Sequence, residues 1–282
     1  MTVAVIVDSA ASLPPALAGR WGIGVVPLQV TAGGESWAEG RGIGPDQVVA
    51  LLRAGDEVST SQPTPAAFDA AIAAAVDAGA EGIVILSLSS MLSGTCEAAR
   101  AAAARSTVRV EVVDTRTVAM AQGFAAIAAA QAAHAGAPID RVADAARTVA
   151  ATARCVFYVE SLDHLRRGGR IGPAVAAVGR VLGIRPVLEV VDGEVIVASR
   201  ARSLGRARAQ LHATVDEAVE RCAHPVVAVM GVGADDAGES VAREIEARHP
   251  GVGPVVLGDV SAVLGVHAGP GTLSAVVADL QG

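Results

Sequence analysis

The sequence of 282 residues contains no lysine, because all 22 of its basic residues are arginine. This absence excludes the phosphate-binding loop whose signature needs a lysine, Schiff-base chemistry and catalysis by a lysine general base. Aromatic residues are also scarce, at 2% of the chain, although hydrophobic residues make up 52%. The interior is therefore predicted to consist of aliphatic side chains, and recognition of nucleic-acid bases by stacking is not expected.

Acidic residues outnumber basic residues by 29 to 22, which gives a formal net charge of −7. A general attraction to nucleic acid or to an anionic membrane is therefore not expected. Cys96, Cys155 and Cys222 are odd in number, widely spaced and flanked by apolar residues. This pattern indicates buried thiols in a reducing cytoplasm, and no two His or Cys residues have the spacing of metal ligands. We expect neither a metal nor a cofactor.

The first residues, MTVAVIVDSAASLPP, lack the basic region of a signal peptide, and an aspartate ends the apolar run at position 8. They predict a first β-strand rather than a targeting segment. The longest weakly charged stretch, residues 120–137, contains two glutamines and a histidine, which makes it too polar for a membrane span. We interpret this stretch as a buried helix and expect a soluble, cytoplasmic protein.

Three apolar, β-branched runs at residues 3–7, 83–86 and 108–113 lead into turns and then into Ala-rich stretches. This alternation is typical of a parallel α/β sheet. Beyond residue 159 the pattern changes, and residues 188–197 predict a hairpin around an Asp-Gly turn. We therefore predict two α/β domains. Residues 1–158 form a mainly parallel sheet with flanking helices, and residues 159–282 form a mixed or antiparallel sheet with helices.

The stretch SLSSMLSGT, residues 87–95, places five hydroxyl residues directly after an apolar strand. A helix expected from Cys96 would direct its free N–H groups at whatever the loop encloses, which suits an anion. Ser93 or Thr95 alone would be explained as a helix N-cap. Five hydroxyl groups exceed what one cap requires, so this loop is a candidate binding site.

A second polar stretch, STSQPTP, spans residues 59–65 and precedes a predicted helix. Thr64 and Pro65 account for the start of that helix, since proline favours the first helical position. Thr60 and Ser61 are not explained by capping. They either line the same site as the first loop or belong to an ordinary solvated loop, and the residues leave both interpretations open.

A third stretch, GVHAGPGT at residues 265–272, places His267 among small residues just ahead of a predicted terminal helix. A single histidine is more often structural than functional. The glycines and the proline nevertheless predict a bend that brings the backbone close to another group. His267 can donate a hydrogen bond to a carboxylate or act as a base.

The segment from Arg166 to Arg208 carries nine arginines and three acidic residues, a local charge of +6 in an acidic chain. Such segregation indicates an anion or an acidic partner nearby. Within it, the run LRRGGRIGP at residues 165–173 is typical of a helix end followed by an exposed turn. A solvated face explains the arginines at 206 and 208 better than it explains Arg170.

Five of these features occur in one order along the chain. They are Asp8-Ser9, the Thr-Ser-Gln-Pro loop, Ser-Ser-x-x-Ser-Gly-Thr, Leu-Asp-x-Leu-x-x-Gly-Gly-Arg-Ile at residues 162–171, and His-x-Gly-Pro-Gly at residues 267–271. Together they resemble the DegV family, the bacterial fatty-acid-binding proteins also called FakB. The resemblance runs from Val3 to Thr272, nearly the whole chain.

The resemblance implies two α/β domains that hold one long-chain fatty acid in an apolar tunnel between them. It also implies that the chain catalyses no reaction itself. Members of the family present the fatty-acid carboxyl group to a separate ATP-dependent fatty acid kinase subunit, which forms an acyl phosphate for phospholipid synthesis. A transient contact with a membrane or an acyltransferase is compatible with this role, whereas nucleic acid is not expected as a partner.

The family's functional residues fall on specific positions of this sequence. The carboxylate-binding residues implied are Thr60, Ser61, Ser93, Gly94, Thr95 and His267, with the contact made by either Thr60 or Ser61. The basic surface implied for docking the kinase comprises Arg170 and Arg202. The physical argument agrees, because a buried carboxylate needs hydrogen-bond donors and an acyl chain needs an apolar wall.

Two other functions remain as alternatives. A serine hydrolase would use Ser93 as nucleophile, His267 as base and Asp8 or Asp114 to orient the base, although the Gly-x-Ser-x-Gly nucleophile motif is absent. A protein that binds a phosphorylated metabolite would use Arg170 and helix N-termini as its anion site.

Overall fold

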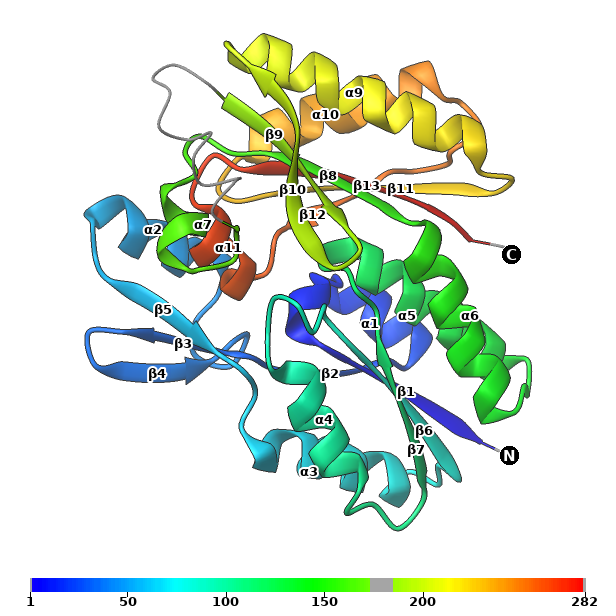
Figure 1. Ribbon diagram of the computed structural model, residues 1–282. Helices are drawn as coiled ribbons and strands as arrows, with labels where there is room; N and C mark the ends of the chain where they lie inside the picture. The colour runs from blue at the N-terminus through cyan, green and yellow to red at the C-terminus, as the bar shows by residue number, and fades with distance from the viewer. Residues whose placement is uncertain (1, 173–184, 281–282) are drawn as a thin grey trace.

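Two β-sheets and their helices are stacked in alternating layers in the computed structural model, which describes residues 2–172 and 185–280 (Figure 1). The smaller sheet lies in the lower half of Figure 1 and the larger sheet in the upper half, with α5 (Ala119–His134) and α6 (Ile139–Thr152) between them. Pro173 and Arg180 of the arginine-rich segment lie outside the described residues. The predicted α/β fold with two sheets is confirmed.

The smaller sheet has four parallel strands in the order β2-β1-β6-β7. Their bounds are Gly24–Val26, Val3–Asp8, Gly82–Ser87 and Arg109–Asp114. The three apolar runs predicted as strands are therefore β1, β6 and β7. Every residue of β6 is buried, as expected for a central parallel strand covered on both faces.

Helices cover both faces of this sheet. Ile6, Ile83 and Ile85 pack against α3 (Pro65–Asp77) and α4 (Thr95–Ala103) on one face. The alternate side chains, including Val7 and Leu86, point to the other face, toward α5 and α6. The period-two alternation of a strand accounts for this division.

Helix α5 lies between the two sheets and is buried on all sides from Ala119 to Ala130. A helix that is apolar all round is stable only when it is enclosed, and here it contacts β1 and β6 of one sheet and β8 and β13 of the other. The predicted buried helix is confirmed. Within the described ranges, no helix combines the length and the hydropathy needed to cross a membrane.

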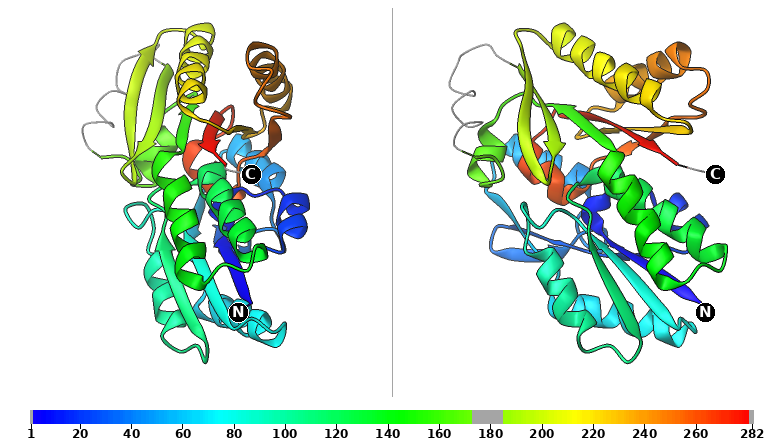
Figure 2. Two further views of the ribbon diagram at one scale, coloured as in Figure 1. Left: turned by 90° about the vertical axis from the view of Figure 1, so that its right-hand side faces the viewer. Right: turned by 45° about the vertical axis from the view of Figure 1, so that its right-hand side comes forward.

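The larger sheet has six strands in the order β10-β9-β8-β13-β11-β12, and all neighbours are antiparallel except β11 and β12. Their bounds are Glu194–Ala201, Arg185–Val191, Arg154–Tyr158, Leu273–Asp279, Pro225–Gly231 and Val256–Asp259. The predicted hairpin is confirmed, because β9 and β10 are joined at Asp192 and Gly193, both with positive φ. Helices α9 (Leu204–Arg221) and α10 (Asp235–Arg248) cover the outer face (Figure 2).

The terminal segment differs from the prediction. The expected helix after residue 272 is wrong, because Leu273–Asp279 forms strand β13 in the middle of the six-stranded sheet. Six of its seven residues are buried. A short apolar run buried on both faces has no clear helical or strand period, and pairing with β8 and β11 decides its conformation.

A third sheet, with three antiparallel strands in the order β4-β3-β5, lies beside these layers. The strands span Glu35–Ala38, Gln29–Ala32 and Val58–Ser61. Helices α2 (Pro45–Ala54) and α11 (Ala262–Ala268) contact this sheet. The 3₁₀ helix η1 (Ser9–Ala11) and α7 (Asp163–Arg167) contact α11, and α1 (Pro15–Trp21) contacts α5. Figure 1 shows α2, α7 and α11 together on its left side, although they come from distant parts of the chain.

The division into residues 1–158 and 159–282 stays a proposal. Strand β8 ends at Tyr158 and pairs with β9 and β13 of the larger sheet. A division that followed sheet membership would therefore place the boundary before Arg154. One buried cluster includes Val7 and Leu86 of the smaller sheet together with Phe157 and Leu188 of the larger, so the two parts pack tightly.

Candidate functional site

A cavity lies between the two sheets, and Val190 and Val195 of the β9–β10 hairpin form part of its wall. The space between atoms in and around this cavity is about 850 Å³, a volume that includes open solvent. Most of its wall is apolar, and all but two of these residues are aliphatic: Leu28, Leu88, Leu92, Val118, Ala119, Cys155, Phe157, Leu165, Val190, Val195, Val260, Val263, Leu264 and Ala268. The low aromatic content of the sequence predicted an aliphatic wall. Among the described lining residues, Phe157 is the single member of the Phe, Trp and Tyr group.

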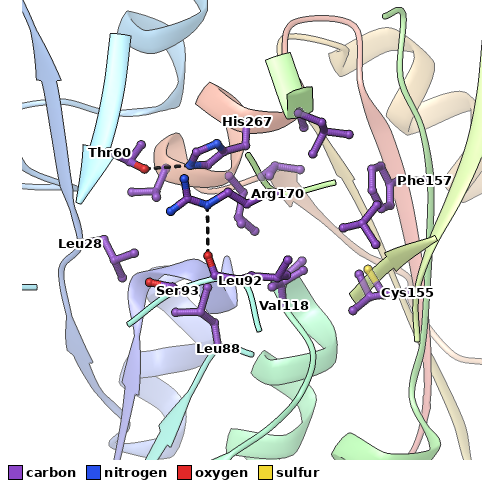
Figure 3. A pocket seen from close by; sticks show the side chains of 18 of the residues that line it. Leu28, Thr60, Leu88, Leu92, Ser93, Val118, Cys155, Phe157, Arg170 and His267 are labelled. Atoms are coloured by element: carbon purple, nitrogen blue, oxygen red, sulfur yellow. Dashed lines mark hydrogen bonds between the residues drawn. The ribbon is translucent and has the colours of Figure 1, made fainter. Parts of the chain in front are cut away.

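Polar side chains gather at one end of the cavity. Figure 3 shows Thr60, Ser93, Arg170 and His267 around that end, while Cys155 and Phe157 lie at the opposite end. Ser61 and Gln62 also line the cavity. Thr272 and Ser274 do so as well, but their hydroxyl groups donate to backbone oxygens of Ala268 and Met230. We call the end around Thr60 and His267 the polar end, and the end around Cys155 and Phe157 the apolar end.

His267 lies in the last turn of α11, and its Nε2 is 2.8 Å from the Oγ1 of Thr60 in β5. Burial, and to a smaller extent the charge of Arg170, lowers the pKa of His267 to about 4. The imidazole is therefore neutral near pH 7 and carries one N–H. Its Nδ1 is buried and has no hydrogen-bond partner among the described residues.

Two glycines of the sequence motifs make room for histidine rings. A Cβ atom on Gly168, the first glycine of the Gly-Gly-Arg turn, would clash with Nδ1 of His267. A Cβ atom on Gly269 would lie 2.5 Å from Cδ2 of His164, and its φ of +83° also favours glycine. The bend predicted at residues 265–272 thus brings backbone close to a side chain of α7.

The Ser-Gly-Thr loop contributes one side chain to the cavity wall. Ser93 lines the cavity, and its Oγ lies 2.8 Å from Oγ1 of Thr95. Gly94 and Thr95 are not part of the wall. Gly94 instead allows a close approach of the Thr-Ser-Gln-Pro loop, because a Cβ atom there would lie 2.6 Å from Oε1 of Gln62.

The capping hypotheses for the two hydroxyl stretches are only partly correct. Helix α4 begins at Thr95, one residue earlier than expected, and its N-cap is Gly94 without a side-chain cap bond. Ser93 and Thr95 are therefore not the N-cap. Helix α3 begins at Pro65 as predicted, but the side chain of Thr64 makes no capping bond.

The other hydroxyl groups of residues 87–95 serve the surrounding structure. Ser87 donates to the carbonyl oxygen of Leu88, and Ser89 donates to the carbonyl oxygen of Gly193 at 2.7 Å. Ser90 is exposed. The interpretation of this loop as a cluster of ligand-binding hydroxyls is therefore too broad, because Ser89 holds the hairpin tip.

Arg170 and Arg202 lie in different surroundings. Arg170 is part of the cavity wall; its Nε donates to the carbonyl oxygen of Leu92 at 3.1 Å and another nitrogen donates to that of Gly168. No carboxylate pairs with Arg170 in the described part of the chain. Arg202 is exposed just beyond β10 and is not in the wall. The family resemblance implied a docking role for Arg170, and only the phosphometabolite alternative gave it a ligand-binding role; the structure places it in the cavity wall.

The catalytic triad of a serine hydrolase is not assembled. Ser93 and His267 bond to Thr95 and Thr60 rather than to each other. Asp8 is fully buried; it accepts from the backbone N–H groups of Leu88 and Ala10, and burial raises its pKa to about 7. The carboxylate of Asp114 accepts from the N–H groups of Ser90 and Arg116. Neither carboxylate orients His267.

The three cysteines are free thiols, and Cys96 and Cys155 are buried as predicted, whereas Cys222 is only partly buried. Burial raises the pKa of Cys96 to about 11 and that of Cys155 to about 12, so both remain protonated. Among the residues with described positions, no group of three His, Cys, Asp or Glu side chains is placed to hold a metal ion.

Comparisons with known proteins agree with the motif order. The family model described as "Uncharacterised protein, DegV family" matches residues 2–279. A DegV domain-containing protein of Streptomyces coelicolor is 40% identical over 277 residues, 98% of each chain. A DegV family structure from Thermus thermophilus, described as binding fatty acid, has a TM-score of 0.90 and 31% identity and covers 99% of this chain and 100% of its own. The DegV structure from Bacillus subtilis, described as a fatty-acid-binding protein, has a TM-score of 0.90 and 25% identity and covers 99% of both chains. The chain therefore belongs to the DegV family.

Proposed function

We propose that this protein binds one long-chain fatty acid in the cavity, with its carboxylate at the polar end and its acyl chain along the aliphatic wall. The observation that carries the proposal is the one-sided placement of the polar groups. An arginine without a carboxylate partner in the described part of the chain, two hydroxyl groups and a histidine lie at one end of a cavity whose wall is mostly apolar. The relatives from T. thermophilus and B. subtilis, described as binding fatty acids, support the same ligand class.

The apolar wall provides most of the binding free energy. Each methylene removed from water contributes about 0.8 kcal/mol, so a sixteen-carbon chain contributes on the order of 10 kcal/mol before the cost of ordering the ligand. This contribution depends on area rather than direction. The carboxylate then has to be compensated, because a buried carboxylate without partners costs several kcal/mol or more.

Arg170 is the group best suited to neutralise the carboxylate, since His267 is uncharged near neutral pH. Thr60 and Ser93 are the proposed hydroxyl donors, with Ser61 as a second candidate on β5. Gly94 and Thr95 shape the loop that holds Ser93 and are not proposed as direct contacts.

The tautomer of His267 decides what Thr60 offers to the ligand. If Nε2 carries the proton, it donates to Oγ1 of Thr60, and the Thr60 hydroxyl hydrogen is free for the carboxylate. If Nδ1 carries the proton, a buried N–H faces Gly168 without an acceptor. Unpaired buried N–H groups are rarer than unpaired acceptors, so we favour the first tautomer. His267 then acts by orienting Thr60.

We further propose that the protein presents the carboxylate to a separate ATP-dependent fatty acid kinase, which forms an acyl phosphate for phospholipid synthesis. The missing Ser93–His267 bond and the partly open cavity support a carrier rather than an enzyme acting on the lipid. Arg202, exposed beside the six-stranded sheet, is the proposed docking contact.

Native mass spectrometry of the purified protein tests the ligand directly. A stoichiometric added mass that denaturing extraction identifies as a long-chain fatty acid is the expected result. A protein that is empty and also fails to take up added palmitic acid contradicts the proposal. Displacement of bound lipid by inorganic phosphate would instead favour a phosphorylated metabolite, and turnover of an activated ester that is lost in Ser93→Ala would favour a hydrolase.

A further inference from the structure

A group of polar side chains outside the cavity holds the first turn of α11, the helix that carries His267. Ser9 donates from its Oγ to Oε2 of Glu39 at 2.5 Å and accepts from the N–H of Leu28 at 2.9 Å. Oε1 of Glu39 in turn accepts from the N–H of Val263 at 3.4 Å. We call Ser9, Ser12 and Glu39 the α11 anchor.

Ser12 makes a second hydrogen bond to the N-terminal end of α11. Its Oγ accepts from the N–H of Ser261 at 2.9 Å, across 249 positions of sequence. Ser12 is buried and has a φ of 51°, a conformation that few residues other than glycine adopt. Ser261 is the N-cap of α11 and accepts from the N–H of Leu264. Ser12 thus contacts the helix start directly, and Ser9 does so only through Glu39; neither serine lines the cavity.

The proposed ligand site does not explain why Glu39 lies where it does. Glu39 is outside the cavity wall, and no arginine with a described position forms an ion pair with it. Burial raises the pKa of Glu39, while its bonds to Ser9 and to N–H groups of α11 act in the opposite direction. Burying such a group is costly unless it is hydrogen-bonded. Its carboxylate bonds to Ser9 and to the helix start, and Ser9 in turn accepts from Leu28, which itself lines the cavity.

Helix α11 connects this anchor to the polar end. Val263 and His267 are four residues apart, about 6 Å along the helix axis at 1.5 Å per residue. Both line the cavity. At the far end, the only hydrogen bond of the His267 ring among the described residues is the 2.8 Å contact with Thr60. A short helix moves as a unit, so release of its first turn displaces His267, and a hydrogen bond weakens when its length changes by a few tenths of an ångström.

We propose that Glu39, held by Ser9 and assisted by Ser12, positions α11 so that His267 meets Thr60 at the polar end of the cavity. Glu39 is thus a positioning residue for recognition of the ligand carboxylate, from outside the ligand site. This inference rests on the proposed function.

The test compares Glu39→Ala and Glu39→Gln for two ligands, palmitic acid and its methyl ester, by titration calorimetry. We expect Glu39→Ala to weaken binding of the acid at least 10-fold and binding of the ester less than 3-fold. Glu39→Gln keeps an oxygen for the N–H of Val263 and an amide group that can donate to Ser9, so it should retain the acid within 3-fold. Glu239→Ala, an exposed position on α10, is the matched control and should change neither ligand.

A second measurement follows the His267 ring by NMR, with its signal identified from His267→Gln. We expect the ring signals to shift in Glu39→Ala and to return toward wild type in Glu39→Gln. Unchanged acid affinity in Glu39→Ala would overturn the inference, as would an equal loss for acid and ester, which indicates general loss of structure. If wild type bound neither ligand, the proposed function would fail, and an unchanged His267 signal in Glu39→Ala would then overturn the positioning role separately.

Discussion

The polar end of the cavity takes its side chains from four distant parts of the chain, whereas the apolar end is formed largely by neighbouring strands of one sheet. The polar groups come from β5, the loop after β6, the turn after α7, and α11. The apolar end takes its side chains from β8, β9 and β10, which are adjacent in the six-stranded sheet. The polar end therefore forms only when distant parts of the chain pack together. The apolar end depends on the β9–β10 hairpin and the adjacent strand β8.

This difference separates two kinds of selectivity. At the polar end, hydrogen bonds near 2.8 Å and the space left by two glycines fix individual atoms. At the apolar end only volume and apolar area matter, because hydrophobic burial has no direction. The polar end should therefore recognise the carboxylate, and the apolar end should select the length of the acyl chain.

The largest effect is expected at the apolar end, from Val195→Trp. The side chain of Val195 lines the cavity, and an indole ring there would displace about four methylenes of a long acyl chain. At about 0.8 kcal/mol each, the loss is about 3 kcal/mol, or roughly 100-fold in affinity for palmitic acid. Calorimetry with acids of sixteen and ten carbons should show the loss mainly for the longer one.

Ile196→Trp is the matched control, because Ile196 is the next residue on β10, faces the other side of the sheet and is 38% exposed. It should leave both affinities unchanged. An equal loss for both acids in Val195→Trp would show that the apolar end does not measure chain length.

The next largest effect is expected at the polar end, from Arg170→Ala. Hydrogen bonds to charged groups contribute about 1.5 to 3 kcal/mol, so loss of the guanidinium should weaken acid binding by about 2 kcal/mol. The methyl ester, which carries no charge, should lose much less. Arg200→Ala, an exposed arginine on β10, serves as the control. Unchanged acid affinity would return Arg170 to a docking role alone, which is how its sequence context was interpreted.

Smaller losses are expected from His267→Ala and Ser93→Ala, which each remove one neutral polar group. Leaving a buried partner without its hydrogen bond costs about 1 to 3 kcal/mol, and we expect the lower end of this range, about 1 kcal/mol, because both groups are neutral. Competition binding with palmitic acid measures the loss, and Ser90→Ala, an exposed serine of the same loop, should have no effect. If both variants bound the acid as wild type does, the assignment of the polar end would be wrong.

The pH dependence of stability distinguishes His267 from other buried groups. Its pKa in the folded chain is about 4, below the ordinary value of 6.5, so between these values the unfolded chain binds the extra proton. The free energy of unfolding should therefore fall as the pH drops through this window. Compared with His267→Gln, wild type should lose on the order of 1 kcal/mol more of its free energy of unfolding across this window. The loss is smaller than the full pKa difference implies, because the ring is not completely buried.

Asp8 affects the pH dependence of stability in the opposite direction. Because wild type and His267→Gln both contain Asp8, the difference between them removes the contribution of Asp8. Its pKa is about 7 in the folded chain and 3.8 ordinarily, so the folded chain binds the extra proton and gains stability on acidification. Chemical denaturation at pH 7, 5.5 and 4.5 measures both variants. Parallel pH profiles for wild type and His267→Gln would show that His267 titrates normally.

The polar end could be predicted from sequence because its residues are unusual in their surroundings. Thr60, Ser93 and His267 stand out as polar groups next to apolar strands, and each lines the cavity. Ser89 stands out equally, yet it bonds to Gly193 in the hairpin. A hydroxyl group after a strand looks the same in sequence whether it contacts a ligand or another loop, so the sequence alone could not separate these two serines.

The apolar end could not be predicted in the same way. Val190 and Val195 line the cavity, while Val156 and Val187 in the same sheet face α9. Aliphatic residues in strands differ only by the face they occupy, and the pairing register of the hairpin assigns that face. The strand β13 was missed for a related reason, because a short run buried on both faces has no distinguishing period.

The smallest effect on the cavity is expected from Arg202→Ala, and this variant tests whether docking is separate from both ends. Arg202 is exposed and outside the wall, so palmitic acid affinity should stay within about 2-fold of wild type. Phosphorylation of the bound acid by an ATP-dependent fatty acid kinase should slow, mainly at low ionic strength, because exposed charges steer association and salt screens them. A rate equal to wild type at all salt concentrations would remove Arg202 from the docking surface. Release of the lipid would instead connect this position to the cavity, and the division between binding and docking would no longer hold.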